Sequence, residues 1–326
     1  MSCRIVESKS EYQSFCQRET GIPLFSQDWW LNAVAGPDNW NALLALQGDT
    51  VVGTLPFVIN RRLNSILLTQ PKLTQSLGPW VRPSSAKYSN AMAKEKDILG
   101  ALADGLPKFD IYRQNWDTAR TNWLPFYWRG FEQTTRYTYV LTDLSDLDAV
   151  WQGTQSDIKS NIRKAKNRFG IRIRFTEDMG ELIPLIRKTF ERQNIRLPFS
   201  EQFLHHVDEA AASKGNRAII LGEDVGGRLH AGTYIVWEAD TAYQLLNGYD
   251  PDLRESGAGS LCVWSAILKA AQHVNRYDFE GSMLEPVERF FRAFGAKQVP
   301  YFQVSRTQSR LLKTAICLRS LIRSGK

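Results

Sequence analysis

Two stretches of the chain share one pattern of apolar and polar positions, residues 40–62 and residues 216–240. Each has two apolar runs around a turn rich in Gly and Asp, which predicts a β-hairpin. The second run of each contains a Gly-Thr pair (Gly53-Thr54 and Gly232-Thr233), and the pairs are 232 − 53 = 179 residues apart. Because this offset exceeds half of the chain, the pattern indicates a duplicated domain, with two unrelated hairpins as the alternative.

Other helices and strands are predicted on both sides of the hairpins. In the first half a helix is expected to start at Ser26 as its N-cap. In the second half the spacing of apolar residues predicts helices at 156–170, 180–196, 200–215, 261–274 and 286–295. It predicts strands at 171–175, 242–250, 276–282 and 301–306. The order strand, turn, helix, strand predicts a parallel βαβ element. We therefore expect an α/β chain with mixed, mostly antiparallel sheets flanked by helices, in two domains at 1–145 and 146–326.

Composition narrows the class of protein only slightly. Of the 326 residues, 43% are apolar and 23% are charged, as in soluble globular proteins. The net charge of +7 favours an anionic partner such as a phosphorylated cofactor, nucleic acid or membrane surface. The four cysteines form no C-x-x-C pair, no H-E-x-x-H motif occurs, and no run of about 18 apolar residues is present, so neither a signal peptide nor a transmembrane helix is expected. These features predict a cytoplasmic protein without a metal.

Two segments are strongly basic. Residues 158–175 contain seven basic residues and no acid, and Arg163 among them is a candidate for binding an anionic substrate. A solvated helix face or a small anionic substrate is favoured, with RNA as the alternative. After Glu288 the chain has nine basic residues and no acid. For residues 309–326 a helix packed on its domain with a frayed end is favoured, and peripheral binding to the inner face of an anionic membrane is the alternative.

The chemistry-bearing motif follows the predicted strand at 242–250 and precedes a helix. It reads Arg254-x-x-Gly257-x-Gly259. Glycines let a ligand approach the backbone closely, a helix N-terminus offers free N–H groups, and an arginine adds charge-assisted hydrogen bonds. The motif thus predicts a pyrophosphate cradle, and a glycine-rich helix start without a ligand is the alternative.

This motif resembles the acyl-CoA loop of the GNAT N-acetyltransferase superfamily. The wider chain resembles the double-GNAT group of Fem-type and CelD-like proteins in three further segments, residues 25–30 (FSQDWW), 159–173 (KSNIRKAKNRFGIRI) and 277–297 (YDFEGSMLEPVERFFRAFGAK). The resemblance implies two tandem GNAT-like domains, of which the second holds acyl-CoA. It implies that the pyrophosphate lies on Arg254, Gly257, Ala258, Gly259 and Ser260. A backbone N–H near Leu246 or Asn247 would face the thioester carbonyl.

The chain departs from the family pattern in its last helix. Phe291 stands where many GNAT enzymes have a tyrosine acid, and the lysine of the Fem-type Phe-Lys-x-x-Phe-Gly motif is absent. Glu280 and Asp278, at the end of a strand, are the candidate general bases, and Tyr249 is a weaker candidate. Trp80 and Tyr301 are candidates for the acceptor cleft, and His230 is expected on the surface beside a turn.

Three functions fit these patterns. The first is an N-acyltransferase that uses acyl-CoA and an amine acceptor, such as an amino sugar or a precursor of envelope or exopolysaccharide polymers. The second is a Fem-type transferase that uses aminoacyl-tRNA and acts on a peptidoglycan precursor; Phe291 disfavours it. The third is a double-GNAT scaffold without catalysis.

Overall fold

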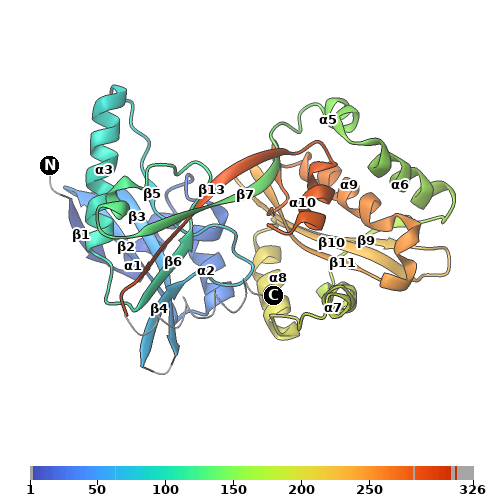
Figure 1. Cartoon of the computed structure of the whole chain (residues 1–326), viewed down its shortest axis with the longest axis horizontal. Coiled ribbons are helices and arrows are strands. Elements are labelled where there is room, and N and C mark those ends of the chain that lie inside the picture. Colours follow the sequence, from blue (N-terminus) through green and yellow to red (C-terminus); the bar gives the residue numbers. More distant parts are fainter. Residues whose placement is uncertain (1–2, 63, 282, 310–312, 314–326) are drawn as a thin grey trace. The chain divides into compact units, whose positions relative to one another are not determined.

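The computed structural model describes residues 3–62, 64–281, 283–309 and 313, which form two compact units (Figure 1). The first holds the described residues up to Arg136 and from Pro300 on, and the second holds Tyr137–Val299. The sequence placed the boundary between residues 145 and 146 and left the chain end in the second domain. The structure differs because β13 (Lys297–Thr307) pairs antiparallel with β6 (Ile111–Asn115), which returns the chain to the first unit.

The first unit has the strand order β1-β2-β3-β4-β6-β13, with β5 on β3. Its other elements are β1 (Arg4–Glu7), α1 (Lys9–Cys16), α2 (Asp28–Ala35), β2 (Trp40–Gln47), β3 (Thr50–Arg62), β4 (Ser65–Thr69), β5 (Trp80–Val81), α3 (Tyr88–Asp104) and α4 (Leu124–Tyr127). The hairpin predicted at 40–62 is confirmed. The N-cap prediction is wrong, because Ser26 ends a buried 3₁₀ turn and Gln27 occupies the cap position of α2.

The second unit has the strand order β8-β9-β10-β11-β12-β7. Its elements are β7 (Glu132–Leu141), which begins in the first unit, α5 (Leu147–Gly153), α6 (Ser156–Asn167), β8 (Arg172–Thr176), α7 (Ile183–Arg192), α8 (Glu201–Ser213), β9 (Arg217–Glu223), β10 (Leu229–Glu238), β11 (Thr241–Tyr249), α9 (Ala258–Ala270), β12 (Arg276–Asp278) and α10 (Glu285–Arg292). The second hairpin is also confirmed, as β9 and β10.

The two sheets have the same topology, as a duplication requires. In each, a strand that follows the hairpin is joined through a helix to a parallel strand, β4 to β6 in the first and β11 to β12 in the second. The closing strands are exchanged. β7 follows β6 in sequence but pairs with β12, and β13 follows β12 but pairs with β6. Each sheet is therefore completed by a strand from the other half of the chain.

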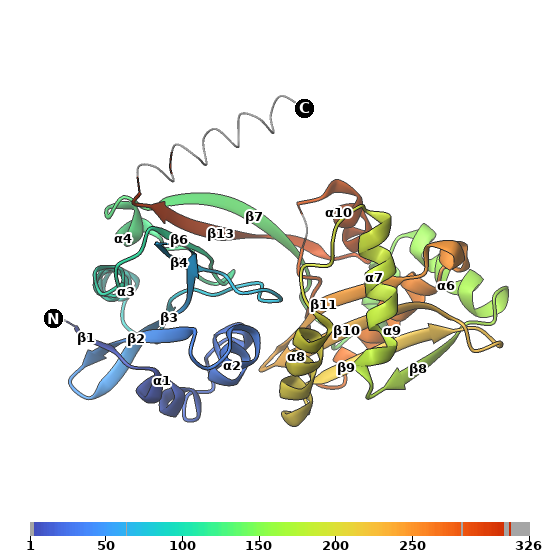
Figure 2. The ribbon, with the colours of Figure 1, turned by 90° about the horizontal axis from the view of Figure 1, so that it is seen from below.

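Helices cover both faces of the second sheet, with α6 and α9 on one face and α7 and α8 on the other (Figures 1 and 2). Ile158, Ile162 and Ala165 of α6 are buried at helical spacing, and its basic residues, including Arg163, lie on the remaining side. On the opposite face α7 lies directly on the sheet. A Cβ added to Gly248 of β11 would be 2.7 Å from the backbone nitrogen of Ile186. This contact holds the first turn of α7 against β11.

Candidate functional site

Strand β11 has different partners along its two sides. On one side it pairs with β10, and the register shifts at Leu245, which forms a β-bulge. On the other side, among the described residues, its parallel ladder with β12 ends at Tyr243 and Asp278. From Gln244 to Tyr249 this side of β11 therefore forms a sheet edge. An extended ligand can pair with such an edge as an added strand does.

A cavity of about 480 Å³ lies at this edge. The last turn of α7, the turn after β11, the start of α9 and one side of α10 complete its walls. Of the predicted site residues, the following line it: Leu246, Asn247, Tyr249, Arg254, Gly257, Ala258, Gly259 and Ser260. All seven residues predicted to hold the acyl donor thus surround a single cavity.

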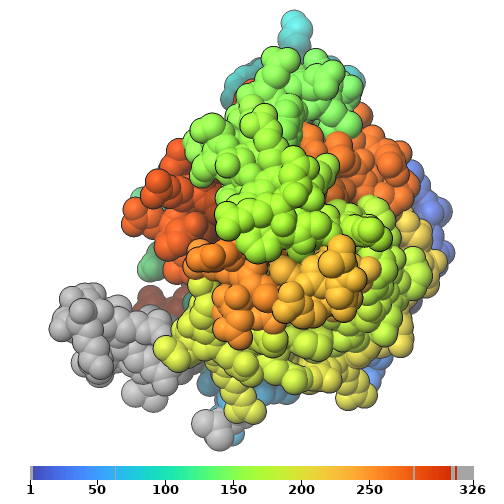
Figure 3. All heavy atoms as spheres, turned by 90° about the vertical axis from the view of Figure 1, so that its right-hand side faces the viewer, coloured from blue at the N-terminus to red at the C-terminus, as the bar shows by residue number. Residues whose placement is uncertain are grey.

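Both glycines of the motif have a packing reason of their own. Gly257 has a φ of +77°, and a Cβ there would be 2.4 Å from the backbone oxygen of Asn161. Residues 251–256 adjoin α6 at this point, as the orange and light green atoms in Figure 3 show. A Cβ on Gly259 would be 2.4 Å from Cε1 of Tyr249. The sequence motif is therefore explained in part without any ligand.

The turn between β11 and α9 is held by ionic and capping contacts. Asp250 caps the 3₁₀ helix Pro251–Ser256, where its carboxylate accepts a 3.1 Å hydrogen bond from the N–H of Asp252. Lys188 of α7 donates a 2.5 Å hydrogen bond to the same carboxylate and holds the pKa of Asp250 below its usual value. This contact ties the turn after β11 to α7.

Positive charge gathers at this end of the cavity. The N–H groups of Gly259 and Ser260 lie in the first turn of α9, where no helical carbonyl is available to accept from them. Arg254 is exposed, and no carboxylate among the described residues pairs with it. The helix dipole adds to this field. An anionic group of a ligand is therefore favoured here.

His230 also lines the cavity, and the prediction of a surface position for it is wrong. The residue is 4% exposed, and Nε2 lies 3.2 Å from the Oδ2 of Asp224. Because a carboxylate only accepts, Nε2 carries the proton. Nδ1 is then a buried acceptor without a partner among the described residues. The hairpin turn between Asp224 and His230 was visible in the sequence, but not which of its side chains point inward.

Glu280 combines burial with backbone strain. Its φ is +56°, a conformation that costs a non-glycine residue about 1–2 kcal/mol. Its Oε1 is buried with no hydrogen-bond partner among the described residues. Burial first, and then the charge of Asp278, raise the pKa of Glu280 well above its usual value. Backbone strain and a buried carboxyl oxygen without a partner are typical of functional residues.

Asp278 positions Glu280. Its Oδ1 accepts a 2.8 Å hydrogen bond from the N–H of Glu280 and a second one from the hydroxyl of Thr138. The carboxylate therefore holds the strained turn. Neither Asp278 nor Glu280 lines the 480 Å³ cavity.

The remaining predicted residues serve other purposes or lie elsewhere. Burial raises the pKa of Tyr249, so its hydroxyl keeps its proton at neutral pH and is no base. Trp80 is a core residue of the first unit, with its ring edge-on to Phe15 at 5.4 Å. Tyr301 accepts a 3.3 Å hydrogen bond from Arg136, and Arg163 is exposed on α6. Trp80, Tyr301 and Arg163 do not line the cavity.

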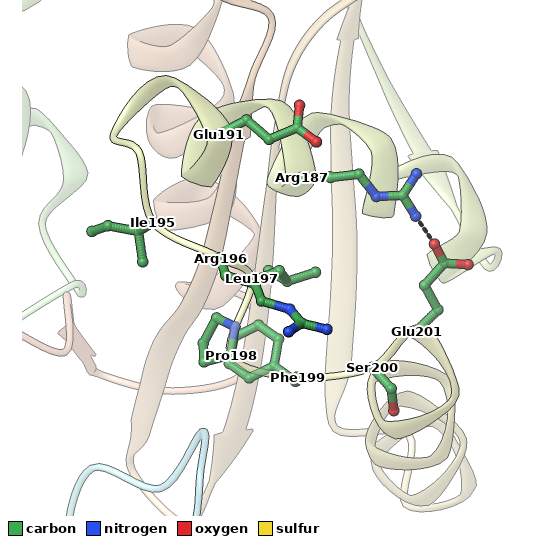
Figure 4. A pocket seen from close by; sticks show the side chains of 9 residues that line it. All are labelled: Arg187, Glu191, Ile195, Arg196, Leu197, Pro198, Phe199, Ser200 and Glu201. Atoms are coloured by element: carbon green, nitrogen blue, oxygen red, sulfur yellow. Dashed lines mark ion pairs between the residues drawn. The ribbon is translucent and has the colours of Figure 1, made fainter.

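A second, more open cavity of about 750 Å³ lies between α7, α8 and the loop that joins them (Figure 4). Figure 4 shows Arg187 and Glu201 joined as an ion pair at one side, and Arg196 with Phe199 below. Phe199 contacts Phe190 edge-to-face at 6.1 Å, and Phe190 lines the first cavity. The end of α7 therefore separates the two cavities.

Residues 152–292 match the protein family described as acetyltransferase (GNAT) domain. These residues lie within the second unit. Its β11, the Arg254 turn and α9 form the strand, loop and helix that the GNAT resemblance predicted, and Phe291 lines the cavity at the position of the missing tyrosine. No curated protein matches the chain by sequence.

Solved structures share the fold of nearly the whole chain. FemX has a TM-score of 0.67 at 12% identity, over 93% of this chain and 97% of its own. A tandem GNAT protein from the clavulanic acid biosynthesis pathway has a TM-score of 0.56 at 10% identity, over 94% and 98%. L-PGS from Bacillus licheniformis has a TM-score of 0.51 at 12% identity, over 97% and 98%. At these identities the likeness shows the fold alone, which is that of a tandem, Fem-like GNAT protein.

Two further observations concern metals and membranes. Among the described residues, no three His, Cys, Asp or Glu side chains gather as a metal ion would require. Within the same part of the chain, no helix combines the length and the apolar character needed to cross a bilayer. The predicted membrane contact of the C-terminal tail concerns residues 309–326, and of these only Ser309 and Lys313 lie among the described residues.

Proposed function

We propose that the protein transfers an acyl group from acyl-CoA to the nitrogen of an amine acceptor. The observation that carries the proposal is the single cavity that joins the free edge of β11 to the positive end at Arg254 and α9. A CoA thioester has the matching parts, an extended amide-containing arm and a pyrophosphate. The arm would pair with β11, and the pyrophosphate would accept from the N–H groups of Gly259 and Ser260 and from Arg254.

The chemical step needs an oxyanion donor and a base. The bulge at Leu245 turns backbone groups out of the ladder, and we assign the N–H of Leu246 or Asn247 to the thioester oxygen. The amine nitrogen attacks the carbonyl carbon, its proton passes to a base, and the C–S bond breaks to release the CoA thiolate. We assign the base to Glu280 in its ionised form, acting through water because it does not line the cavity; one of its carboxyl oxygens is buried without a partner among the described residues, and its backbone is strained. Phe291 has no proton for the thiolate, so solvent or the protonated base would supply it.

The second cavity, which the end of α7 separates from the first, would hold the part of the acceptor that lies away from the reacting amine. Phe199 offers an aromatic face there, and Arg196 is exposed beside it (Figure 4). A ring with polar substituents fits these walls, which supports an amino sugar or a precursor of an envelope or exopolysaccharide polymer as the acceptor. We place the reaction in the cytoplasm, where acyl-CoA is available.

A thermal-shift titration tests the donor. Free CoA, acetyl-CoA and longer acyl-CoAs should raise the melting temperature, because a ligand at 100 times its Kd adds about 2.7 kcal/mol to the free energy of unfolding. Arg254→Ala removes a charge-assisted contact worth about 1.5–3 kcal/mol, so the apparent Kd should rise about tenfold or more. Arg61→Ala, at an exposed arginine in the first unit, is the matched control and should leave the shift unchanged.

A flat response to every CoA species would refute the proposal. Charged tRNA would then be the next ligand to test, and a shift with charged tRNA that weakens in salt would point to aminoacyl transfer. Binding of CoA without turnover for any amine would leave the protein as a scaffold.

A further inference from the structure

Large apolar side chains gather on the outside of α4 in the first unit. Leu124, Tyr127 and Trp128 are 40%, 57% and 60% exposed. Their spacing of three and four residues places them on one face of the helical turn. The opposite side of α4 is already occupied, because Phe126 is fully buried in the core of the unit. The outer face, here called the α4 patch (Leu124, Tyr127 and Trp128), is therefore not needed for folding.

Basic side chains surround the α4 patch. Lys96 of α3 lies 5.7 Å from the ring centre of Trp128, and Arg306 of β13 lies 5.3 Å from that of Phe131. Two more arginines form ion pairs nearby, Arg120 with Glu95 and Arg129 with Asp104. No carboxylate among the described residues pairs with Lys96 or Arg306.

The basic end of the chain starts from the same place. Arg306 Nε lies 4.0 Å from the position that a Cβ on Gly130 would take, just after α4, and β13 ends one residue later (Figure 2). From residue 310 on, the sequence contains Arg310, Lys313, Arg319, Arg323 and Lys326, with Leu and Ile between them and no acid. The positive charge beside the α4 patch thus continues along the chain.

We propose that the α4 patch and the basic residues around it dock the protein on an anionic lipid bilayer. Tryptophan and tyrosine favour the boundary between lipid headgroups and acyl chains. Each lysine or arginine near the bilayer surface adds attraction to anionic lipids. A second copy of this chain would bring the same positive charge against the patch, whereas an anionic bilayer complements both its charge and its apolar face. Docking would use the first unit and neither cavity of the second unit, so it does not depend on the proposed reaction.

Co-sedimentation of the full chain with lipid vesicles tests the docking. We expect binding to vesicles of phosphatidylcholine with phosphatidylglycerol, little binding to phosphatidylcholine alone, and weaker binding in high salt. Trp128→Ser should weaken binding about tenfold, the effect of losing about 60 Å² of apolar contact with the bilayer. Tyr88→Ser is the matched control, because Tyr88 is 79% exposed in the same unit but at the start of α3. It should bind as the parent does.

Three results would overturn the proposal. The first is no binding to anionic vesicles. The second is an equal loss of vesicle binding in Trp128→Ser and Tyr88→Ser, which would indicate nonspecific binding by exposed aromatic side chains. The third is unchanged vesicle binding by Trp128→Ser together with a change of mass in analytical ultracentrifugation, which would make the patch a protein contact. Since Trp128 is mostly exposed, an unchanged melting temperature should show that the variants are folded.

Discussion

The packing of Gly259 against Tyr249 allows a direct test of why the motif contains its second glycine. In Gly259→Ala the new Cβ would lie 2.4 Å from Cε1 and 2.9 Å from Cδ1 of the Tyr249 ring. The ring is partly buried and packs against α9, so it must shift, and overpacking of this kind costs about 1–3 kcal/mol. Because alanine has a higher helix propensity than glycine, the substitution also stabilises the helix by up to about 1 kcal/mol. The free energy of unfolding should therefore fall by about 1–2 kcal/mol.

A double-mutant cycle separates ring packing from ligand approach. Tyr249→Leu alone should also destabilise, by about 2 kcal/mol, because it leaves a cavity. In the double variant the smaller leucine leaves room for the Cβ, so the two losses should sum to at least about 1 kcal/mol more than the measured loss. Urea denaturation followed by tryptophan fluorescence gives these values. Additive losses would refute the packing explanation. Unchanged stability of Gly259→Ala with lost CoA binding would instead show that the glycine serves the phosphate.

Further predictions concern the carboxyl groups of Glu280 and Asp224 and the hydrogen bond from Thr138 to Asp278. Burial raises the pKa of Glu280 above its usual 4.5, so the folded protein holds a proton that the unfolded chain releases, and stability falls as pH rises through this interval. Glu280→Gln should therefore melt higher than the parent near pH 7 while acyl transfer falls at least about hundredfold, and lower melting or full turnover would contradict the assignment. Hydrogen bonds from the Arg228 backbone and side chain lower the pKa of Asp224, so its contribution to stability is present above its usual 3.8 and is lost as pH falls. The melting temperature of Asp224→Asn should change less between about pH 6 and pH 3 than that of the parent, and an equal change would count against this. Thr138→Val removes a hydroxyl from the buried carboxylate of Asp278 and should cost about 1–3 kcal/mol in urea unfolding, whereas Thr138→Ser should cost less than half of that; equal losses would exclude the hydrogen bond as the cause.

Neighbouring residues determine much of this fold, and there the sequence sufficed. The spacing of apolar residues and the turn residues between them, read over short segments, predicted both hairpins. They also predicted the βαβ order after the second hairpin and the offset between the copies. The Arg254 motif was readable for the same reason, because a strand, a turn and a helix N-terminus are adjacent in sequence. Seven predicted donor residues accordingly line one cavity.

Contacts between residues far apart in sequence decided the rest. The last strand of each half could pair with its own sheet or with the other sheet. Both pairings join residues far apart in sequence, and the local sequence of the strand fits either, so the exchange of β7 and β13 was not predictable. The same holds for Glu280. Its strained φ depends on a hydrogen bond to Asp278, and Asp278 in turn depends on Thr138, 140 residues away. The sequence determined which residues carry charge and where the chain turns. Tertiary packing decided which of the charged groups are buried away from water, and which glycines have no room for a side chain.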